Sequence, residues 1–217
     1  MERLSSFTVD FDKESHLILP FSTLPMTSEC FRDERGSIFI RSYGYLFAVT
    51  DCLDPDLTFF QNDSKIKHIF FPTKEISGNC RFLMKKEGKA DDYDEKATSE
   101  EMEAFYMTYT PFDVDAEYIE DRIKEGEKTY TVRDKDDKII SALYTTKGHH
   151  QIVDVATRCD YTGKGYATEL LKKVSNVYLF CESEELALFY SRRGFEIKRI
   201  YKELSEDEIR LLFHSRR

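Results

Sequence analysis

The sequence predicts an α/β protein, and two features of the chain lead to this prediction. In the C-terminal half, short strand-like segments alternate with segments in which apolar residues recur every three or four positions, as they do in helices. In the N-terminal half, aromatic and β-branched residues form short runs separated by turn residues, which indicates further strands. We therefore expect helices packed on a sheet, with a β-rich region added at the N-terminus.

The N-terminal region predicts strands but carries no motif. Its strand-like runs cover residues 37–50, 57–60 and 66–71, and turn signals lie between them. The charged, glycine-containing segment 85–96 is the predicted boundary. We therefore divide the chain into a β-rich region, residues 1–88, and a second domain, residues 89–217.

The second domain begins with a predicted helix and continues with strands and helices in turn. The first helix is capped by Thr98 or Ser99 and has acidic residues in its first turn. A turn at residues 134–137 joins two strands. The predicted helices cover 97–105, 115–125, 166–174 and a segment that ends near Gly194, and the predicted strands cover 129–133, 138–145, 151–157, 177–181 and 195–200.

The stretch from Val155 to Thr168 combines an apolar strand, a glycine-containing turn and the start of a helix. Gly163 and Gly165 have no Cβ, so the backbone can come close to a ligand. The first N–H groups of a helix have no partner within it and carry a partial positive charge. Such a site favours an anion, so the stretch predicts a bound phosphate or pyrophosphate.

Two common phosphate motifs do not match this stretch, and an ordinary βα turn without a ligand is the alternative. A Walker loop requires a glycine where Arg158 stands. A dinucleotide fingerprint requires a third glycine where Thr168 stands.

Residues Thr162-Gly-Lys-Gly-Tyr-Ala167 resemble motif A of the GNAT superfamily of N-acetyltransferases, Arg/Gln-x-x-Gly-x-Gly/Ala, except that Thr162 replaces Arg or Gln. In that family the turn and helix start hold the pyrophosphate of coenzyme A through main-chain N–H groups. The resemblance implies acetyl-CoA or coenzyme A as the cofactor. It implies that the cofactor-binding residues are Val155, Ala156, Thr157, Thr162, Gly163, Lys164, Gly165, Tyr166, Ala167, Thr168 and Ser183.

The segment from Ser183 to Phe195 resembles a second GNAT motif, Asn-x-x-Ala-x-x-x-Tyr-x-x-x-Gly-Phe, with Ser183 in place of Asn and Leu186 in place of Ala. The resemblance implies that Tyr190 is the catalytic acid, which protonates the thiolate of coenzyme A as it leaves. A phenol is a proton donor at neutral pH and suits this role. The alternative is a core tyrosine, because Leu186, Phe189 and Tyr190 have the spacing of one helix face.

The resemblance covers residues 90–203 and implies the GNAT acyltransferase fold, a central mixed, mostly antiparallel sheet flanked by helices. It implies an N-acetyltransferase that transfers an acetyl group from acetyl-CoA to a primary amine. Because Thr162 and Ser183 depart from the motifs, a catalytically weak or inactive module that binds coenzyme A as a sensor or interaction domain is the alternative. The N-terminal region is then either an added domain or the degenerate first half of a tandem transferase.

The reaction needs a base for the amine and donors for the charge that develops on the acyl oxygen. Many relatives use a glutamate on the strand before motif A, but Gln151 stands nearest to that position and cannot serve. His149, His150 and Asp154 are the remaining candidates for the base. Main-chain N–H groups near Val155 are the candidate donors.

Composition narrows the class of partner. A net charge of −9 argues against nucleic acid, and no apolar run approaches the roughly 20 residues of a membrane span. Five cysteines without metal-ligand spacing predict reduced thiols in the cytoplasm and no metal site. Acidic residues concentrate between positions 87 and 127, in the two helices that the resemblance implies beside the acceptor site, where they would either attract an amine or form a solvated acidic surface. We expect a small-molecule or peptide amine acceptor, and a homodimer is compatible with the sequence.

Overall fold

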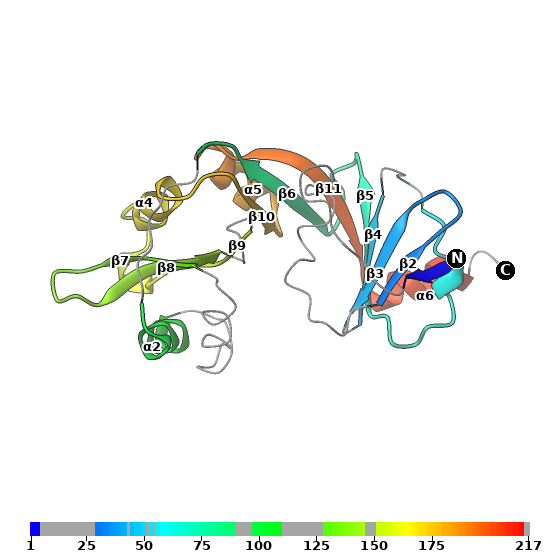
Figure 1. Cartoon of the computed structure of the whole chain (residues 1–217), viewed down its shortest axis with the longest axis horizontal. Coiled ribbons are helices and arrows are strands. Elements are labelled where there is room, and N and C mark those ends of the chain that lie inside the picture. The colour runs from blue at the N-terminus through cyan, green and yellow to red at the C-terminus, as the bar shows by residue number, and fades with distance from the viewer. Residues whose placement is uncertain are drawn as a thin grey trace. The chain divides into compact units, whose positions relative to one another are not determined.

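The computed structural model describes residues 1–4, 29–42, 44–50, 53, 55–89, 97–109, 128–145 and 151–214 (Figure 1). The chain forms two compact units. The first unit contains residues 1–84, 180–188 and 197–217, and the second contains residues 85–179 and 189–196. Each unit is discontinuous in the sequence, and the predicted division into residues 1–88 and 89–217 stays a prediction.

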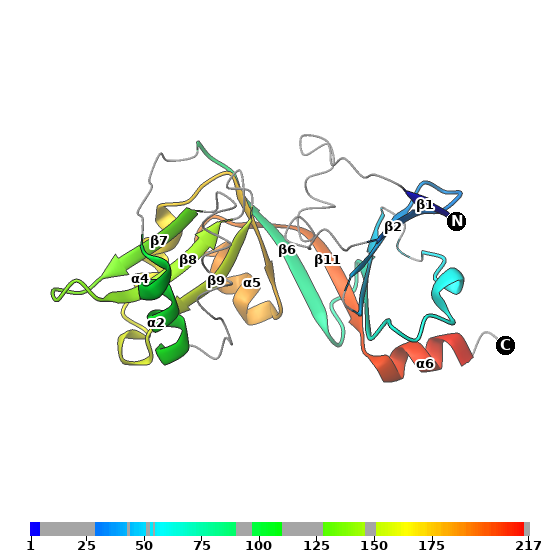
Figure 2. The ribbon, with the colours of Figure 1, turned by 60° about the horizontal axis from the view of Figure 1, so that its bottom comes forward.

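An eight-stranded sheet contains the N-terminal strands, so the β-rich character predicted for this region is confirmed. Its first four strands pair antiparallel, β4 pairs parallel with β5, and β5 pairs antiparallel with β11. Figure 2 shows α6 continuing the chain directly after β11. In spatial order the strands are β1 (Glu2–Leu4), β2 (Glu29–Arg32), β3 (Ile38–Ser42), β4 (Tyr45–Val49), β5 (His68–Thr73), β11 (Glu196–Leu204), β6 (Cys80–Lys86) and β10 (Val177–Cys181).

Two of the expected N-terminal strands differ from the structure. The run 37–50 is two strands, because Gly44 has a φ of +89° and turns the chain between β3 and β4. The run 57–60 is wrong as a strand and forms the 3₁₀ helix η2 (Thr58–Phe60). A carboxylate oxygen of Asp56 accepts the Thr58 N–H at 3.0 Å, which favours a helical turn at this point.

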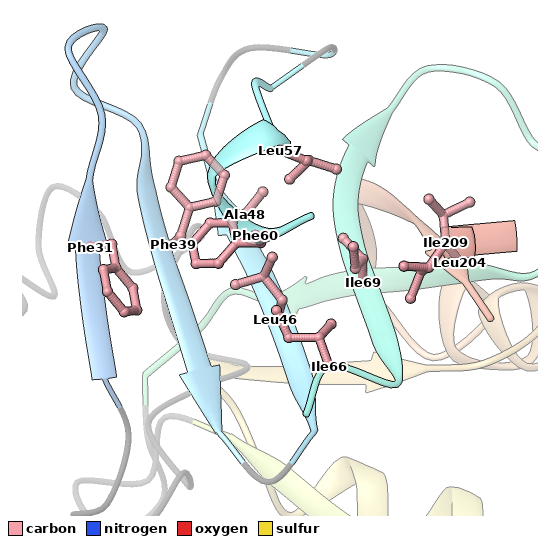
Figure 3. Packing of buried hydrophobic residues seen from close by; sticks show 10 residues of the cluster. All are labelled: Phe31, Phe39, Leu46, Ala48, Leu57, Phe60, Ile66, Ile69, Leu204 and Ile209. Carbon is pink, nitrogen blue, oxygen red and sulfur yellow. The ribbon is translucent and has the colours of Figure 1, made fainter. Parts of the chain in front are cut away.

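The core of the first unit lies between one face of the sheet, η2 and the C-terminal helix α6 (Glu206–His214), as Figure 3 shows. Burial of these apolar side chains is the main stabilising contribution of this unit. Helix α6 is absent from the sequence-based prediction, although Ser205 and Glu208 form a capping box in which the Glu208 carboxylate accepts the Ser205 N–H at 2.9 Å. The buried members of the core are Phe31, Phe39, Leu46, Ala48, Leu57, Phe60, Ile66, Ile69, Leu204 and Ile209.

The second unit is built on a three-stranded antiparallel sheet, β7 (Lys128–Arg133), β8 (Ile139–Thr145) and β9 (Ile152–Thr157). Helix α2 (Ser99–Tyr109) lies on one side of this sheet and α4 (Tyr166–Lys172) on the other (Figure 1). The strands and the turn at 134–137 agree with the prediction, and the Asp137 N–H donates to the Asp134 carbonyl at 3.1 Å. The predicted helix 115–125 lies outside the described residues.

The start of α2 is fixed by the predicted cap at Thr98. The Thr98 hydroxyl accepts the Glu101 N–H at 3.2 Å, and the Glu101 carboxylate accepts the Thr98 N–H at 2.9 Å. The same carboxylate forms two hydrogen bonds with the Arg133 guanidinium, at 2.8 and 3.1 Å. These bonds, first those from Arg133 and then the one from Thr98, hold the pKa of Glu101 below its usual value.

A pH-dependent contribution of Glu101 to stability follows from the lowered pKa. The free energy that the ionised carboxylate adds is present above the unfolded-state pKa, about 4.3, and is lost as the pH falls through the lower folded-state pKa. We expect Glu101→Gln to lower the urea midpoint at pH 7 and to differ less from the parent protein as the pH falls below about 4. Glu103→Gln on the same helix is the control. A penalty that does not change with pH would contradict this assignment.

Candidate functional site

The turn after β9 has the strand, turn and helix sequence expected from residues 155–168. A short 3₁₀ helix, η4 (Cys159–Tyr161), follows Arg158, and α4 begins at Tyr166. Gly163 and Gly165 have φ values of +78° and +92°. Residues with a Cβ adopt this left-handed backbone conformation only with strain. The path of the turn therefore requires glycine at both positions.

Main-chain donors and open space meet at this turn. The hydrogen-bond ladder of α4 starts with the Glu169 N–H, which donates to the Gly165 carbonyl at 3.0 Å. The N–H groups of residues 166–168 precede that bond and have no acceptor within the helix. A Cβ placed on Gly163 or Gly165 would meet no atom within 4 Å. The turn is therefore an exposed surface lined with main-chain donors, and a surface of this kind favours an anion.

Two basic side chains, Arg158 and Lys164, lie beside the Asp160 carboxyl group at this turn. The Arg158 guanidinium pairs with the Asp160 carboxylate at 2.9 Å and holds the pKa of Asp160 below its usual value. The Lys164 ammonium donates to the Asp160 carbonyl at 2.8 Å and lies 4.8 Å from the centre of the Tyr161 ring. Lys164 is thereby held near the glycines, where its charge favours an anion.

Arg193 adds a cation beside α4 that the sequence analysis did not identify. Its Nε donates to the Thr168 hydroxyl at 2.8 Å, and one terminal nitrogen donates to the Phe189 carbonyl at 2.5 Å. The guanidinium carbon lies 3.4 Å from the centre of the Phe189 ring. The Arg193 guanidinium is partly buried, and the resulting desolvation is the main cause that lowers its pKa below the usual value. Its contact with Thr168 links Arg193 to the first turn of α4. No local sequence pattern predicts this contact.

Strand β9 pairs with β8 along one edge and presents main-chain groups at the other. The Arg158 N–H donates to the Ile140 carbonyl of β8 at 2.9 Å, so the trans peptide directs the Thr157 carbonyl away from β8. The Ala156 carbonyl accepts the Ser141 hydroxyl of β8 at 2.8 Å, so the Thr157 N–H also points away. Among the described residues, the bridge between Gln151 and Tyr178 is the one pairing recorded on that edge.

A bulge interrupts β9 at Asp154. The register with β8 shifts between Ala142 and Tyr144, and Asp154 has a φ of +52°. This conformation is uncommon for a residue with a side chain and persists where neighbouring groups hold it. Here the Tyr106 hydroxyl of α2 donates to the Asp154 carbonyl at 2.5 Å. The bulge lies next to Val155, where the sequence analysis placed the donors for the acyl oxygen.

Tyr190 lies on α5 (Glu184–Ser191), which ends before Gly194 as predicted. Tyr190 is buried, and its ring packs edge-on against Phe189 and Phe195 with centroid distances of 5.2 and 5.6 Å. Leu186, expected on the same apolar face, is 38% exposed, because α5 buries Ala187 instead. The catalytic role of the Tyr190 hydroxyl stays a prediction.

Ser183 caps α5, and its hydroxyl accepts the Leu186 N–H at 3.2 Å. It belongs to the first unit, whereas the glycine turn belongs to the second. Its predicted role in cofactor binding is therefore untested by the geometry of the turn. Serine and asparagine share the ability to cap a helix, which explains why Ser183 can replace the expected Asn.

The remaining candidates for chemistry are few. His149 and His150 lie outside the described residues, and Asp154 is half-buried within the bulge. Burial raises the pKa of the Cys181 thiol to about 11, so it is a poor nucleophile at neutral pH, whereas Cys159 is exposed. Within the described ranges, no group of His, Cys, Asp or Glu is arranged to hold a metal ion. No helix in the same ranges has the length and hydrophobicity of a membrane span.

Comparisons with known proteins agree with these features. A family model described as an acetyltransferase (GNAT) domain matches residues 90–212. A putative GNAT-family acetyltransferase from Novosphingobium aromaticivorans is 15% identical, with 88% of this chain and 94% of that chain covered and a TM-score of 0.51. A Drosophila protein is 8% identical, with 83% and 80% covered and a TM-score of 0.56. A GCN5-related N-acetyltransferase from Kribbella flavida is 12% identical, with 78% and 86% covered and a TM-score of 0.51. At these identities the likeness is one of fold, and no curated protein matches the chain.

Proposed function

The chain belongs to the GNAT acetyltransferase family, and from this premise we propose that it transfers an acetyl group from acetyl-CoA to a primary amine. The observation that carries the proposal is the glycine turn at residues 162–168. It combines two left-handed glycines, open space above them and the N–H groups at the start of α4. A pyrophosphate is the part of coenzyme A that such a turn recognises.

The chain supplies separate groups for the two halves of the cofactor. The N–H groups of residues 163–168 hold the pyrophosphate, and Lys164 and Arg193 add positive charge beside it. The outward N–H and carbonyl of Thr157, together with the main chain of Val155, pair with the amide groups of the pantetheine arm. Acetyl-CoA supplies a thioester carbonyl carbon that a neutral amine can attack.

The reaction then requires two proton transfers, one from the attacking amine and one to the leaving thiolate. Main-chain N–H groups at Val155 stabilise the negative charge that develops on the acyl oxygen. Tyr190 donates its hydroxyl proton to the leaving thiolate. A base near β9 removes the proton of the amine, and His149, His150 and Asp154 are its candidates. The acidic side chains in segment 87–127 favour a cationic amine as it approaches.

A module that binds coenzyme A without efficient catalysis is the second candidate. The packing of Tyr190 between two phenylalanine rings is the observation that favours it, because the same packing suits a purely structural tyrosine. Thr162 also replaces the usual Arg or Gln of motif A. This candidate shares the cofactor site and differs only in turnover.

Calorimetry and an acceptor screen together test the proposal. The purified full chain is titrated with coenzyme A and with acetyl-CoA, and a library of primary amines is then assayed for release of free thiol. Binding together with amine-dependent thiol release supports the transferase. Binding without release from any amine supports the module, and the absence of binding would contradict both.

A further inference from the structure

The bulge of β9 is held by a residue that no motif of the sequence indicates. Tyr106 comes from α2, in a part of the chain far from β9, and its hydroxyl donates to the Asp154 carbonyl at 2.5 Å. Asp154 adopts a φ of +52°, which is uncommon outside glycine although Asp tolerates it better than most residues, and which surrounding constraints help to hold. The hydrogen bond from Tyr106 is one such constraint.

The Tyr106 ring itself has little freedom. Tyr106 is fully buried, and its ring stacks on that of Tyr144 with a centroid distance of 5.4 Å and an angle of 13°. It belongs to a cluster with Met102 and Phe105 of the same helix. Because the start of α2 is fixed by its capping box at Thr98, the hydroxyl reaches β9 from a firmly anchored helix.

The bonded carbonyl and the N–H of Val155 belong to one peptide group. In a trans peptide the carbonyl and the N–H point in opposite directions. A hydrogen bond that holds the Asp154 carbonyl toward α2 therefore holds the Val155 N–H away from α2. The same bond polarises the peptide, which strengthens the N–H as a donor.

We propose that Tyr106 is a positioning residue for acyl transfer: its buried hydroxyl fixes the Asp154–Val155 peptide so that the Val155 N–H is aimed at the acyl oxygen. This inference rests on the proposed function. Tyr106 touches neither substrate, and it acts only through the peptide that it orients. Without the hydroxyl, the strained bulge is free to relax, and the donor loses its alignment.

Tyr106→Phe tests the proposal, and Tyr144→Phe is the matched control. Both remove a phenol oxygen from the same stacked, buried pair, but of the two hydroxyls only that of Tyr106 donates to the Asp154 carbonyl. We expect kcat to fall about 10- to 100-fold in Tyr106→Phe, because misplacing an oriented group costs this much. The KM for acetyl-CoA and the affinity for coenzyme A should change less than about twofold, since the lost interaction forms mainly in the transition state. Tyr144→Phe should keep the parent kcat.

Amide hydrogen exchange of residues 152–157 supplies a readout that does not depend on turnover. Exchange should be faster in Tyr106→Phe than in the parent protein and unchanged in Tyr144→Phe. If the parent protein acetylates no amine, the proposed function fails, and with it the role in catalysis, while exchange still decides whether Tyr106 holds the bulge. Equal kcat losses in the two variants, unchanged exchange in Tyr106→Phe, or failure of Tyr106→Phe alone to fold would each overturn the proposal.

Discussion

The substitution Gly165→Val is expected to weaken coenzyme A binding at least about 100-fold, equivalent to about 2.7 kcal/mol. Gly165 has a φ of +92° and immediately precedes α4, and a Cβ there would extend into open space above the turn. A valine side chain would occupy the volume that the pyrophosphate needs, and the strained backbone would misalign the N–H donors. Calorimetry with coenzyme A measures the loss.

Gly36→Val is the matched control for this substitution. Gly36 has a φ of +83°, its Cβ position is also open, and it lies between β2 and β3, in the other unit. Both variants should therefore lose stability through the same left-handed strain, about 1–3 kcal/mol. Only Gly165→Val should lose binding. Equal affinities in the two variants would exclude the glycine turn as the pyrophosphate site.

Tyr190→Phe is expected to lower kcat about 10²- to 10⁴-fold, the contribution of a positioned acid. The ring packs against Phe189 and Phe195 and should keep that packing, so the affinity for coenzyme A should survive. The loss should appear at saturating substrate, because the proton transfer occurs in the transition state. Steady-state kinetics with an amine identified in the acceptor screen measures the effect.

Tyr130→Phe controls for the loss of a buried phenol in the same unit. Tyr130 is buried in β7 and has no proposed part in the chemistry. Parent-like turnover in both variants would leave Tyr190 as a core residue and would favour the binding module over the transferase. A thermal midpoint lowered only in Tyr190→Phe would likewise indicate a structural role.

The sequence predicted the elements whose signals are local. The glycine pair with its following helix, the cap at Thr98 and the turn at 134–137 each depend on a few neighbouring residues, and the structure has all three. The alternation of strands and helices in the second unit also follows from short-range patterns. Agreement of local preference with the final fold is expected wherever the segment does not need a distant partner to choose its conformation.

The elements that were missed depend on context. Thr58, Phe59 and Phe60 suit a strand, but an Asp56 carboxylate oxygen accepts the Thr58 N–H and Phe60 fills the core beneath the sheet. Helix α6 has a visible capping box at Ser205 and an apolar face that includes Ile209. This pattern is visible in the sequence, but it lies beyond residue 203, where the GNAT resemblance ends.

The site was predictable only in part, for the same reason. Motif spacing identified the turn at 162–168. Arg193 contacts Thr168 of this turn and Tyr106 contacts the bulge at Asp154, both from other segments of the chain. The bulge at Asp154 depends on the register between two strands, which a single sequence does not specify. Motifs therefore locate the residues that bind through their own backbone, and the structure adds the residues that position them.

A crystal structure of the full chain with bound coenzyme A would show directly whether the glycine turn is the cofactor site. It should place the pyrophosphate on the N–H groups of residues 163–168 and the pantetheine arm along β9, paired with the main chain of Thr157. The Tyr106 hydroxyl should still contact the Asp154 carbonyl in that complex. A pyrophosphate bound away from the glycine turn, or an arm that does not follow β9, would contradict the proposed site.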